Sequence, residues 1–177
     1  MTGIGSGKVQ KLDLEQAAKL AVSTNKYYAA ELGINSAARV TTVKPSGTTS
    51  CVLGTSSGIH AWHNDFYIRR IRVGKNEAIY DYLAINHPEL VEDDFFKADT
   101  QAIISIPQRA PENGILRHET SIELLNRVKD IYKRWIAPGH TSGNNTHNVS
   151  CTVSVKEEEW DEVGKWMWEN REFYNGL

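Results

Sequence analysis

The sequence has little cysteine and no excess of charge of either sign. It holds 2 cysteines, and its 22 acidic residues nearly balance its 20 lysines and arginines, for a formal net charge of −2. Cys51 and Cys151 lie far apart and no Cys-x-x-Cys pair occurs, which excludes a disulfide framework and a typical zinc site. We interpret both as small buried apolar side chains in a reducing compartment. The charge balance excludes a protein that coats duplex nucleic acid or a membrane surface.

Long hydrophobic runs, low-complexity segments and internal repeats are also missing. No apolar run approaches the roughly 18 residues of a membrane helix. The start, MTGIGSGKVQ, lacks the apolar core of a signal peptide, so we expect a cytoplasmic protein. With 177 residues, 40% of them hydrophobic, the chain can bury one good core. We therefore expect residues 1–177 to form a single domain.

Strand and helix patterns alternate along the chain. β-branched and aromatic residues predict strands, and apolar residues three and four apart predict helices. Pro45 and Pro107 are expected to end the first and third strands. Strand followed by helix, repeated about three times, indicates parallel β-α units and an α/β fold. The predicted strands are 39–44, 66–74, 101–108 and 148–155, and the predicted helices are 13–32, 76–85, 121–137 and 157–170.

A hydroxyl-rich loop follows the first predicted strand, in the sequence VTTVKPSGTTSCVLGTSSGIHAWH. If a helical turn begins near Thr48, Gly47 lets the backbone approach an anion closely, and Ser46, Thr48 and Thr49 supply hydroxyl donors. These groups can form a phosphate cradle. It is not a P-loop, because no Gly-Lys-Ser/Thr follows. The alternative is that Ser46 or Thr48 only caps a short helix and GTSSG is a turn.

The histidines of HAWH are a weaker candidate. His60 and His63 lie three residues apart, a spacing that a metal site could use on a helix, but no third ligand is near in sequence. We favour hydrogen-bonded or solvated histidines and predict no metal site. The start TGIGSG lacks the strand and glycine spacing of a dinucleotide fingerprint, so we interpret it as a loop.

Basic and aromatic clusters also have structural explanations. The arginines of RRIR could meet phosphate or nucleic acid, but strand alternation favours Arg70 and Arg72 on one side and Ile71 toward the core. The aromatic residues of KWMW, together with Trp160, fit a packed helix face better than a base-stacking platform, because no basic stripe accompanies them. We predict no nucleic-acid partner.

Two long runs resemble one enzyme family. VKPSGTTSCVLGTSSGIHAWHNDFYIRRIRVGKNEAIYDYL and GNNTHNVSCTVSVKEEEWDEVGKWMWENREFYNGL are similar to the adenosylcobalamin-dependent (class II) ribonucleotide reductases, and so is TGIGSG with the helix after it. The resemblance is most specific over 44–72 and 144–175. It implies a ten-stranded α/β barrel, of which this chain is a carboxy-side segment, and both ends look like cuts in a longer protein.

The resemblance implies a function for the hydroxyl loop. The family replaces the ribose 2′-hydroxyl by hydrogen through a cysteine thiyl radical, which starts from adenosylcobalamin, and a thioredoxin-type reductant supplies the electrons. The loop matching PSGTTS binds the substrate's phosphates, which assigns Ser46, Gly47, Thr48 and Thr49 to a ribonucleotide's phosphates.

No catalytic residue follows from the resemblance, because neither Cys51 nor Cys151 fits the family's radical cysteine. The segment alone is therefore expected to be inactive. Two alternatives stay open. One is a non-catalytic nucleotide- or phosphate-binding domain that has lost the radical cysteine. The other is a structural piece that binds nothing and associates with itself through its exposed sheet edges.

Overall fold

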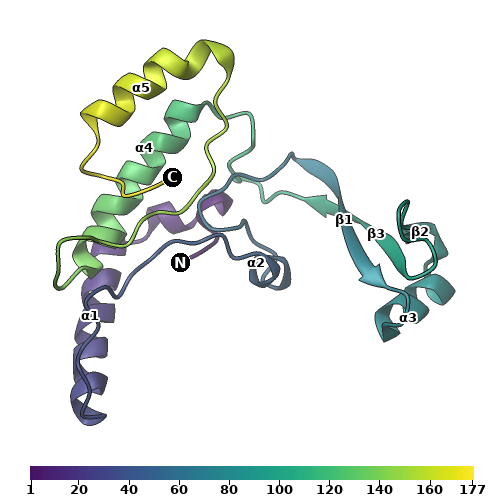
Figure 1. The fold of residues 1–177 in the computed structure, drawn as a ribbon, viewed down its shortest axis with the longest axis horizontal. Coiled ribbons are helices and arrows are strands. Elements are labelled where there is room, and N and C mark those ends of the chain that lie inside the picture. The colour runs from purple at the N-terminus through teal and green to yellow at the C-terminus, as the bar shows by residue number, and fades with distance from the viewer. The chain divides into compact units, whose positions relative to one another are not determined.

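The chain divides into two compact units. The computed structural model describes residues 1–177; the first unit is Met1–Trp62 with Glu112–Leu177, and the second is His63–Pro111. The first unit contains the helices α1, α2, α4 and α5, and the second contains α3 and the strands β1, β2 and β3 (Figure 1). The prediction that residues 1–177 form one domain stays a prediction. No helix is both long enough and apolar enough to cross a bilayer.

The predicted helices of the first unit are confirmed. The helix α1 runs over Leu14–Glu31, and the carboxylate of Asp13 accepts the N–H of Gln16 at its start. The helix α4 runs over Ser121–Ile131 and begins with a capping box between Thr120 and Glu123. The helix α5 covers Trp160–Glu169, directly after a short 3-10 turn.

The helix that begins as α4 widens before it ends. A π-helical turn over Tyr132–Ile136 follows α4, and a 3-10 turn over Ala137–Gly139 follows that. The buried hydroxyl of Thr41 donates to the carbonyl oxygen of Trp135 at 2.6 Å, so it satisfies a group that the wider turn presents. A Cβ on Gly139 would lie 1.9 Å from that hydroxyl, so only glycine fits there.

The core of the first unit lies between helix α4 and two extended segments. One segment carries Val43 and the other carries Val149 and Cys151. A smaller cluster joins Leu125 of α4 to Val163 and Trp166 of α5. The largest fully buried side chains are Ile4, Ile59, Leu125, Ile131, Ile136, Val43, Val128 and Val149.

The predictions of strands over 39–44 and 148–155 are wrong. These segments touch at one parallel bridge, Val43 with Val149, where the N–H of Ser150 donates to the carbonyl of Val43 at 3.0 Å. A strand exists only where a neighbour pairs with it over several residues. Here the pairing consists of isolated bridges, Val43 with Val149 and Arg39 with His140, so the β-branched sequence gives extended backbone without a sheet.

The second unit contains the only sheet. Strands β1 (Phe66–Gly74), β2 (Val91–Asp93) and β3 (Gln101–Arg109) lie in the order β1-β3-β2, and helix α3 (Ala78–Asn86) follows β1. Both strand pairs are antiparallel, so the prediction of parallel units is wrong for these strands. Parallel neighbours need a crossover of about a dozen residues or more, and the connection from β2 to β3 is too short for one.

Pro107 lies inside β3, where the sequence predicts the end of the strand. It pairs with Ile68, and β3 continues to Arg109. The strand β2 pairs only with the stretch from Ala102 to Ile104, so β3 has a single neighbour at Pro107. A residue without an N–H donor is tolerated at such an open edge.

The arginines of β1 form ion pairs across the sheet. Arg70 pairs with Glu92, and Arg72 donates to Asp94 at 2.7 Å, so both arginines lie on one face as predicted. Ile71 pairs with the buried Ile104 and so lies on the other face, as the alternation predicts, although it is itself 37% exposed.

Candidate functional site

The hydroxyl-rich loop has the local structure that its sequence predicts. Helix α2 spans Thr48–Val52, so the helical turn begins at Thr48. Gly47 stands before it with φ 49° and ψ −120°, a backbone conformation that side chains with a Cβ rarely adopt. A Cβ on Gly47 would meet nothing within 4 Å, so the backbone conformation and not crowding favours glycine here.

Several donors of this loop are open to solvent. Gly47, Thr48 and Thr49 are exposed. The backbone N–H groups of Gly47 and Thr48 and the hydroxyls of Thr48 and Thr49 form no hydrogen bond to the rest of the chain. Because α2 has only five residues, its macrodipole is small. Attraction for an anion must therefore come from these separate donors.

The start of the loop is fixed by residues that the sequence analysis missed. The N–H of Ser46 donates to the hydroxyl of Ser57 at 3.0 Å, and the hydroxyl of Ser46 lies 2.6 Å from that of Thr2. The Thr2 hydroxyl also accepts the N–H of Gly58 and donates to the carbonyl of Ser56. No local pattern reveals this contact, since Thr2 and Ser46 are 44 residues apart.

The glycine-rich start of the chain packs under the loop. Residues Ile4–Ser6 form a short 3-10 turn between two glycines with left-handed backbone, so the predicted loop contains one tight turn. Ile4 is fully buried, and a Cβ on Gly5 would lie 2.1 Å from the carbonyl oxygen of His60. Close packing therefore requires glycine at this position.

His60 is hydrogen-bonded on both ring nitrogens, as we favoured. Its Nδ1 lies 3.0 Å from the carbonyl oxygen of Ser57, and its Nε2 accepts the N–H of Thr152 at 3.1 Å. His63 belongs to the second unit. The chain holds no group of three or more His, Cys, Asp or Glu side chains that could bind a metal ion.

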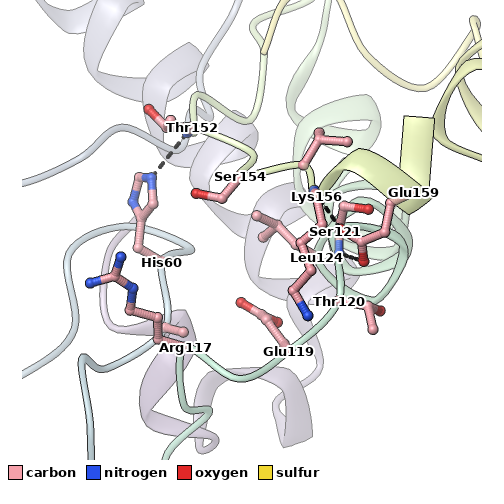
Figure 2. A pocket seen from close by; sticks show the side chains of 12 residues that line it. His60, Arg117, Glu119, Thr120, Ser121, Leu124, Thr152, Ser154, Lys156 and Glu159 are labelled. Carbon is pink, nitrogen blue, oxygen red and sulfur yellow. Dashed lines mark hydrogen bonds between the residues drawn. The ribbon is translucent and has the colours of Figure 1, made fainter.

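A polar cavity of about 420 Å³ lies beside His60 (Figure 2). At its far wall the carboxylate of Glu159 accepts the N–H of Ser121 at 3.2 Å and the N–H of Lys156 at 3.0 Å. These bonds, first of all the one from Lys156, lower the pKa of Glu159. The side chains that line the cavity and carry charge or hydroxyls are His60, Arg117, Glu119, Thr120, Ser121, Thr152, Ser154, Lys156 and Glu159.

A buried ion pair adjoins the cavity. Arg127 binds both carboxylate oxygens of Glu119, at 2.6 and 2.7 Å, and the side chains are only 8% and 13% exposed. The second nitrogen of the Arg127 fork also lies 3.5 Å from the carbonyl oxygen of Ile59. Two such bonds in parallel fix the direction of both side chains.

The two cysteines differ in environment. Cys151 is buried, and burial raises the pKa of its thiol to about 11. Cys51 is exposed on α2, which contradicts the prediction that both are buried. Both are free thiols.

Comparison with known proteins gives the family. No protein-family model matches the chain. A probable adenosylcobalamin-dependent ribonucleoside-triphosphate reductase of Dictyostelium discoideum is 30% identical over 144 residues, which are 77% of this chain and 17% of the relative. The adenosylcobalamin-dependent ribonucleoside-triphosphate reductase of Lactobacillus acidophilus is 28% identical over 145 residues, 82% of this chain and 19% of the relative. This chain is related to the adenosylcobalamin-dependent ribonucleotide reductases. The resemblance stated from the sequence is confirmed.

The fold of the reductase relatives agrees with this assignment. The crystal structure of a B-12 dependent (class II) ribonucleotide reductase matches with a TM-score of 0.72 and 22% identity, over 91% of this chain and 22% of that chain. The mixed helix and strand content is therefore that of a class II reductase segment. The chain spans about a fifth of the length of the curated relatives it matches.

The residues of this chain do not fit a cobalamin. The hollows described in this structure measure about 420, 610 and 450 Å³, within the range of pockets for drug-sized ligands, about 300–1,000 Å³, and a cobalamin is larger than such a ligand. The two larger ones are open surface hollows, and one of these is lined by the Arg–Glu and Arg–Asp pairs of the sheet. We therefore assign no residue of this chain to the cofactor.

Proposed function

We propose that this chain is the segment of a ribonucleotide reductase barrel that binds the phosphates of the substrate. The complete protein would reduce ribonucleotides to 2′-deoxyribonucleotides by thiyl radical chemistry, with adenosylcobalamin as the source of the radical. Residues 1–177 would form one part of a ten-stranded α/β barrel. The parallel bridge of Val43 with Val149 supports this, since the two extended segments run in the same direction where they touch, as neighbouring strands of a parallel barrel do.

One observation carries the proposal: the N–H groups of Gly47 and Thr48 and the hydroxyls of Thr48 and Thr49 belong to exposed residues and form no hydrogen bond to the rest of the chain. Hydroxyls and N–H groups that a fold leaves open on a fixed loop suit an anion that supplies acceptors. We assign direct phosphate contacts to the N–H groups of Gly47 and Thr48 and to the hydroxyls of Thr48 and Thr49. The hydroxyl of Ser46 would join them from its place beside Thr2.

The proposed substrate is a ribonucleoside triphosphate, because the relatives are named for that substrate. Binding the phosphates fixes the rest of the nucleotide, so the contribution of this segment to the reaction is orientation of the ribose. Neither Cys51 nor Cys151 is assigned to the chemistry. Electrons from a thioredoxin-type reductant would enter through other cysteines of the complete protein.

A second candidate is a nucleotide-binding protein without reductase activity. Neither cysteine of this chain suits a radical cysteine on a finger loop, because Cys151 is buried and Cys51 lies on α2, so this chain alone does not distinguish the two candidates. The two candidates differ in the complete protein. A finger-loop cysteine whose replacement by alanine abolishes reduction supports the reductase, and its absence supports the binding protein.

Calorimetric titration with ATP, ADP and adenosine tests the loop directly. Replacing Thr48 and Thr49 together by valine keeps the shape and removes both hydroxyls. We expect the binding free energy of ATP to become less favourable by about 1–3 kcal/mol, the range for hydrogen bonds to a charged group. The control is Thr24→Val, at an exposed threonine of α1 that should leave affinity unchanged.

Two other results would change the assignment. Equal ATP affinity of the double valine variant and the parent chain would contradict the proposed contacts of the hydroxyls. If adenosine binds as tightly as ATP, the phosphates do not contribute to binding, and the proposed phosphate site is contradicted. If the chain binds neither ligand, the same variants are compared in the complete reductase, where the loop has its full surroundings.

A further inference from the structure

The ring of His60 joins two segments that are far apart in sequence. The partner of Nδ1 is a carbonyl oxygen, on Ser57, and the partner of Nε2 is an N–H group, on Thr152. A carbonyl can only accept and a backbone N–H can only donate. The two bonds together therefore require the neutral imidazole with its proton on Nδ1. Protonation at Nε2 would place two donors face to face and break the bond to Thr152.

Ser57, the partner of Nδ1, connects His60 to the phosphate loop. The hydroxyl of Ser57 accepts the N–H of Ser46 at 3.0 Å, and Ser46 directly precedes Gly47. The N–H of His60 also donates to the Ser57 carbonyl at 3.0 Å, so both the ring and the backbone of His60 hold this residue. A displacement of the ring would thus move the residue on which the start of the loop depends.

Thr152, the partner of Nε2, connects His60 to the extended segment 148–155. Thr152 lies two residues after Ser150, whose N–H donates to the carbonyl of Val43. The bond from Thr152 to His60 therefore ties the same extended segment to the residues that follow the loop. Thr152 is exposed and lines the polar cavity, where a bound ligand can touch it (Figure 2).

The two carboxylates near the ring are already engaged with other partners. Glu119 is paired with Arg127, and Glu159 accepts two backbone N–H groups. No carboxylate is bonded to the imidazole. The charged side chains facing His60 across the cavity or packed behind it are Arg117, Glu119, Arg127, Lys156 and Glu159.

We propose that His60 is a positioning residue that couples the phosphate loop to the segment 148–155. It holds Ser57, and through Ser57 it holds Ser46, at a fixed place relative to Thr152. Ligand binding at the loop therefore changes the hydrogen bond at Thr152, and a change at Thr152 alters the position of the loop. The inference rests on the proposed function for the identity of the ligand, but the coupling itself is a property of the chain.

Two substitutions separate the two bonds of the ring. The amide nitrogen of asparagine lies near the position of Nδ1, so His60→Asn keeps a donor for Ser57 and loses the contact with Thr152. The longer His60→Gln places an acceptor near Nε2 for Thr152 and loses the donor to Ser57. His60→Ala loses both. The control is His118→Ala, at an exposed histidine.

Amide hydrogen exchange by NMR reads each bond separately. We expect exchange at Ser46 to be about five- to tenfold faster in the Ala and Gln variants, the effect of one lost hydrogen bond, and close to the parent value in the Asn variant. Exchange at Thr152 should be faster in the Ala and Asn variants and preserved in Gln. The ring nitrogens of the parent chain should show the tautomer protonated on Nδ1.

Coupling is read by adding ATP. In the parent chain we expect ATP to slow exchange at Thr152, and in His60→Asn this response should disappear although Ser46 stays protected. Unchanged Ser46 exchange in both His60→Ala and His60→Gln overturns the inference. So does an ATP response at Thr152 that persists in His60→Asn.

The two proposals fail in different ways. If ATP does not bind the parent chain, the proposed function loses its support in this chain, while the exchange rates of Ser46 and Thr152 without ligand still decide whether His60 positions the loop. Should His60→Ala fail to fold, as judged by circular dichroism, the Asn and Gln variants decide alone, because each removes one bond.

Discussion

At the scale of the residue, the two cysteines have similar neighbours in the sequence but different surroundings in the fold. Both cysteines follow a serine and precede a β-branched residue, and composition gives no reason to tell them apart. Cys151 lies in the core cluster, where desolvation disfavours the thiolate, and the nearby Arg127 only partly offsets this. Cys51 lies on the surface of α2.

This difference predicts selective alkylation of the thiols. At mildly alkaline pH, a thiol with a pKa of about 11 is almost entirely protonated, and the thiolate is the reactive form. Iodoacetamide should therefore label Cys51 and leave Cys151 unmodified, as measured by peptide mass spectrometry. Labelling of both in denaturant is the control. Equal alkylation rates of the two cysteines in the folded chain would contradict the burial of Cys151.

At the scale of the element, one carboxylate ties the start of α4 to the turn before α5. Glu159 accepts the N–H of Ser121, the first residue of α4, and the N–H of Lys156, which precedes the acidic turn. It takes the place of an anion at a helix start, where free N–H groups need an acceptor. The sequence shows only a run of three glutamates and does not indicate which one makes this contact.

The lowered pKa of Glu159 predicts a pH-dependent contribution to stability. A carboxyl with a folded pKa below its unfolded value stabilises the fold above the unfolded pKa, and this contribution is lost as the pH falls through the folded pKa. Glu159→Gln should therefore lower the melting temperature at neutral pH and match the parent in acid. Glu158→Gln, at an exposed neighbour, is the control. A constant difference across this pH range would contradict the assignment.

The helices were predictable because their signals are local. The capping residues Asp13 and Thr120 and the apolar spacing of α4 lie within the segments that they shape. The start of α2 at Thr48 follows in the same way from Gly47. The segments 39–44 and 148–155 failed as strands because pairing depends on a distant neighbour. The anchors Thr2 and Ser57 were missed for that reason too, since contact across many residues leaves no local pattern.

At the scale of the whole molecule, buried apolar surface is distributed unevenly. Both hydrophobic clusters lie in the first unit, and the buried apolar residues of the second unit are only Ala102, Ile104 and Ala110. The N–H groups of Cys151, Val153 and Val155 form no hydrogen bond in the chain, so one edge of this segment is open. A groove of about 450 Å³ beside it is lined by uncharged side chains, Trp160 among them.

An open backbone edge next to an apolar groove leads us to predict self-association of this chain. Sedimentation velocity should show a mass that rises with concentration. Trp160→Lys puts a charge into the groove at a side chain that is 59% exposed, so folding should survive and association should weaken. Trp168→Lys is the matched control, because Trp168 is 71% exposed on the same helix but outside the groove. Equal association of the two variants would exclude the groove as the contact surface, and a parent chain that stays monomeric would exclude self-association itself.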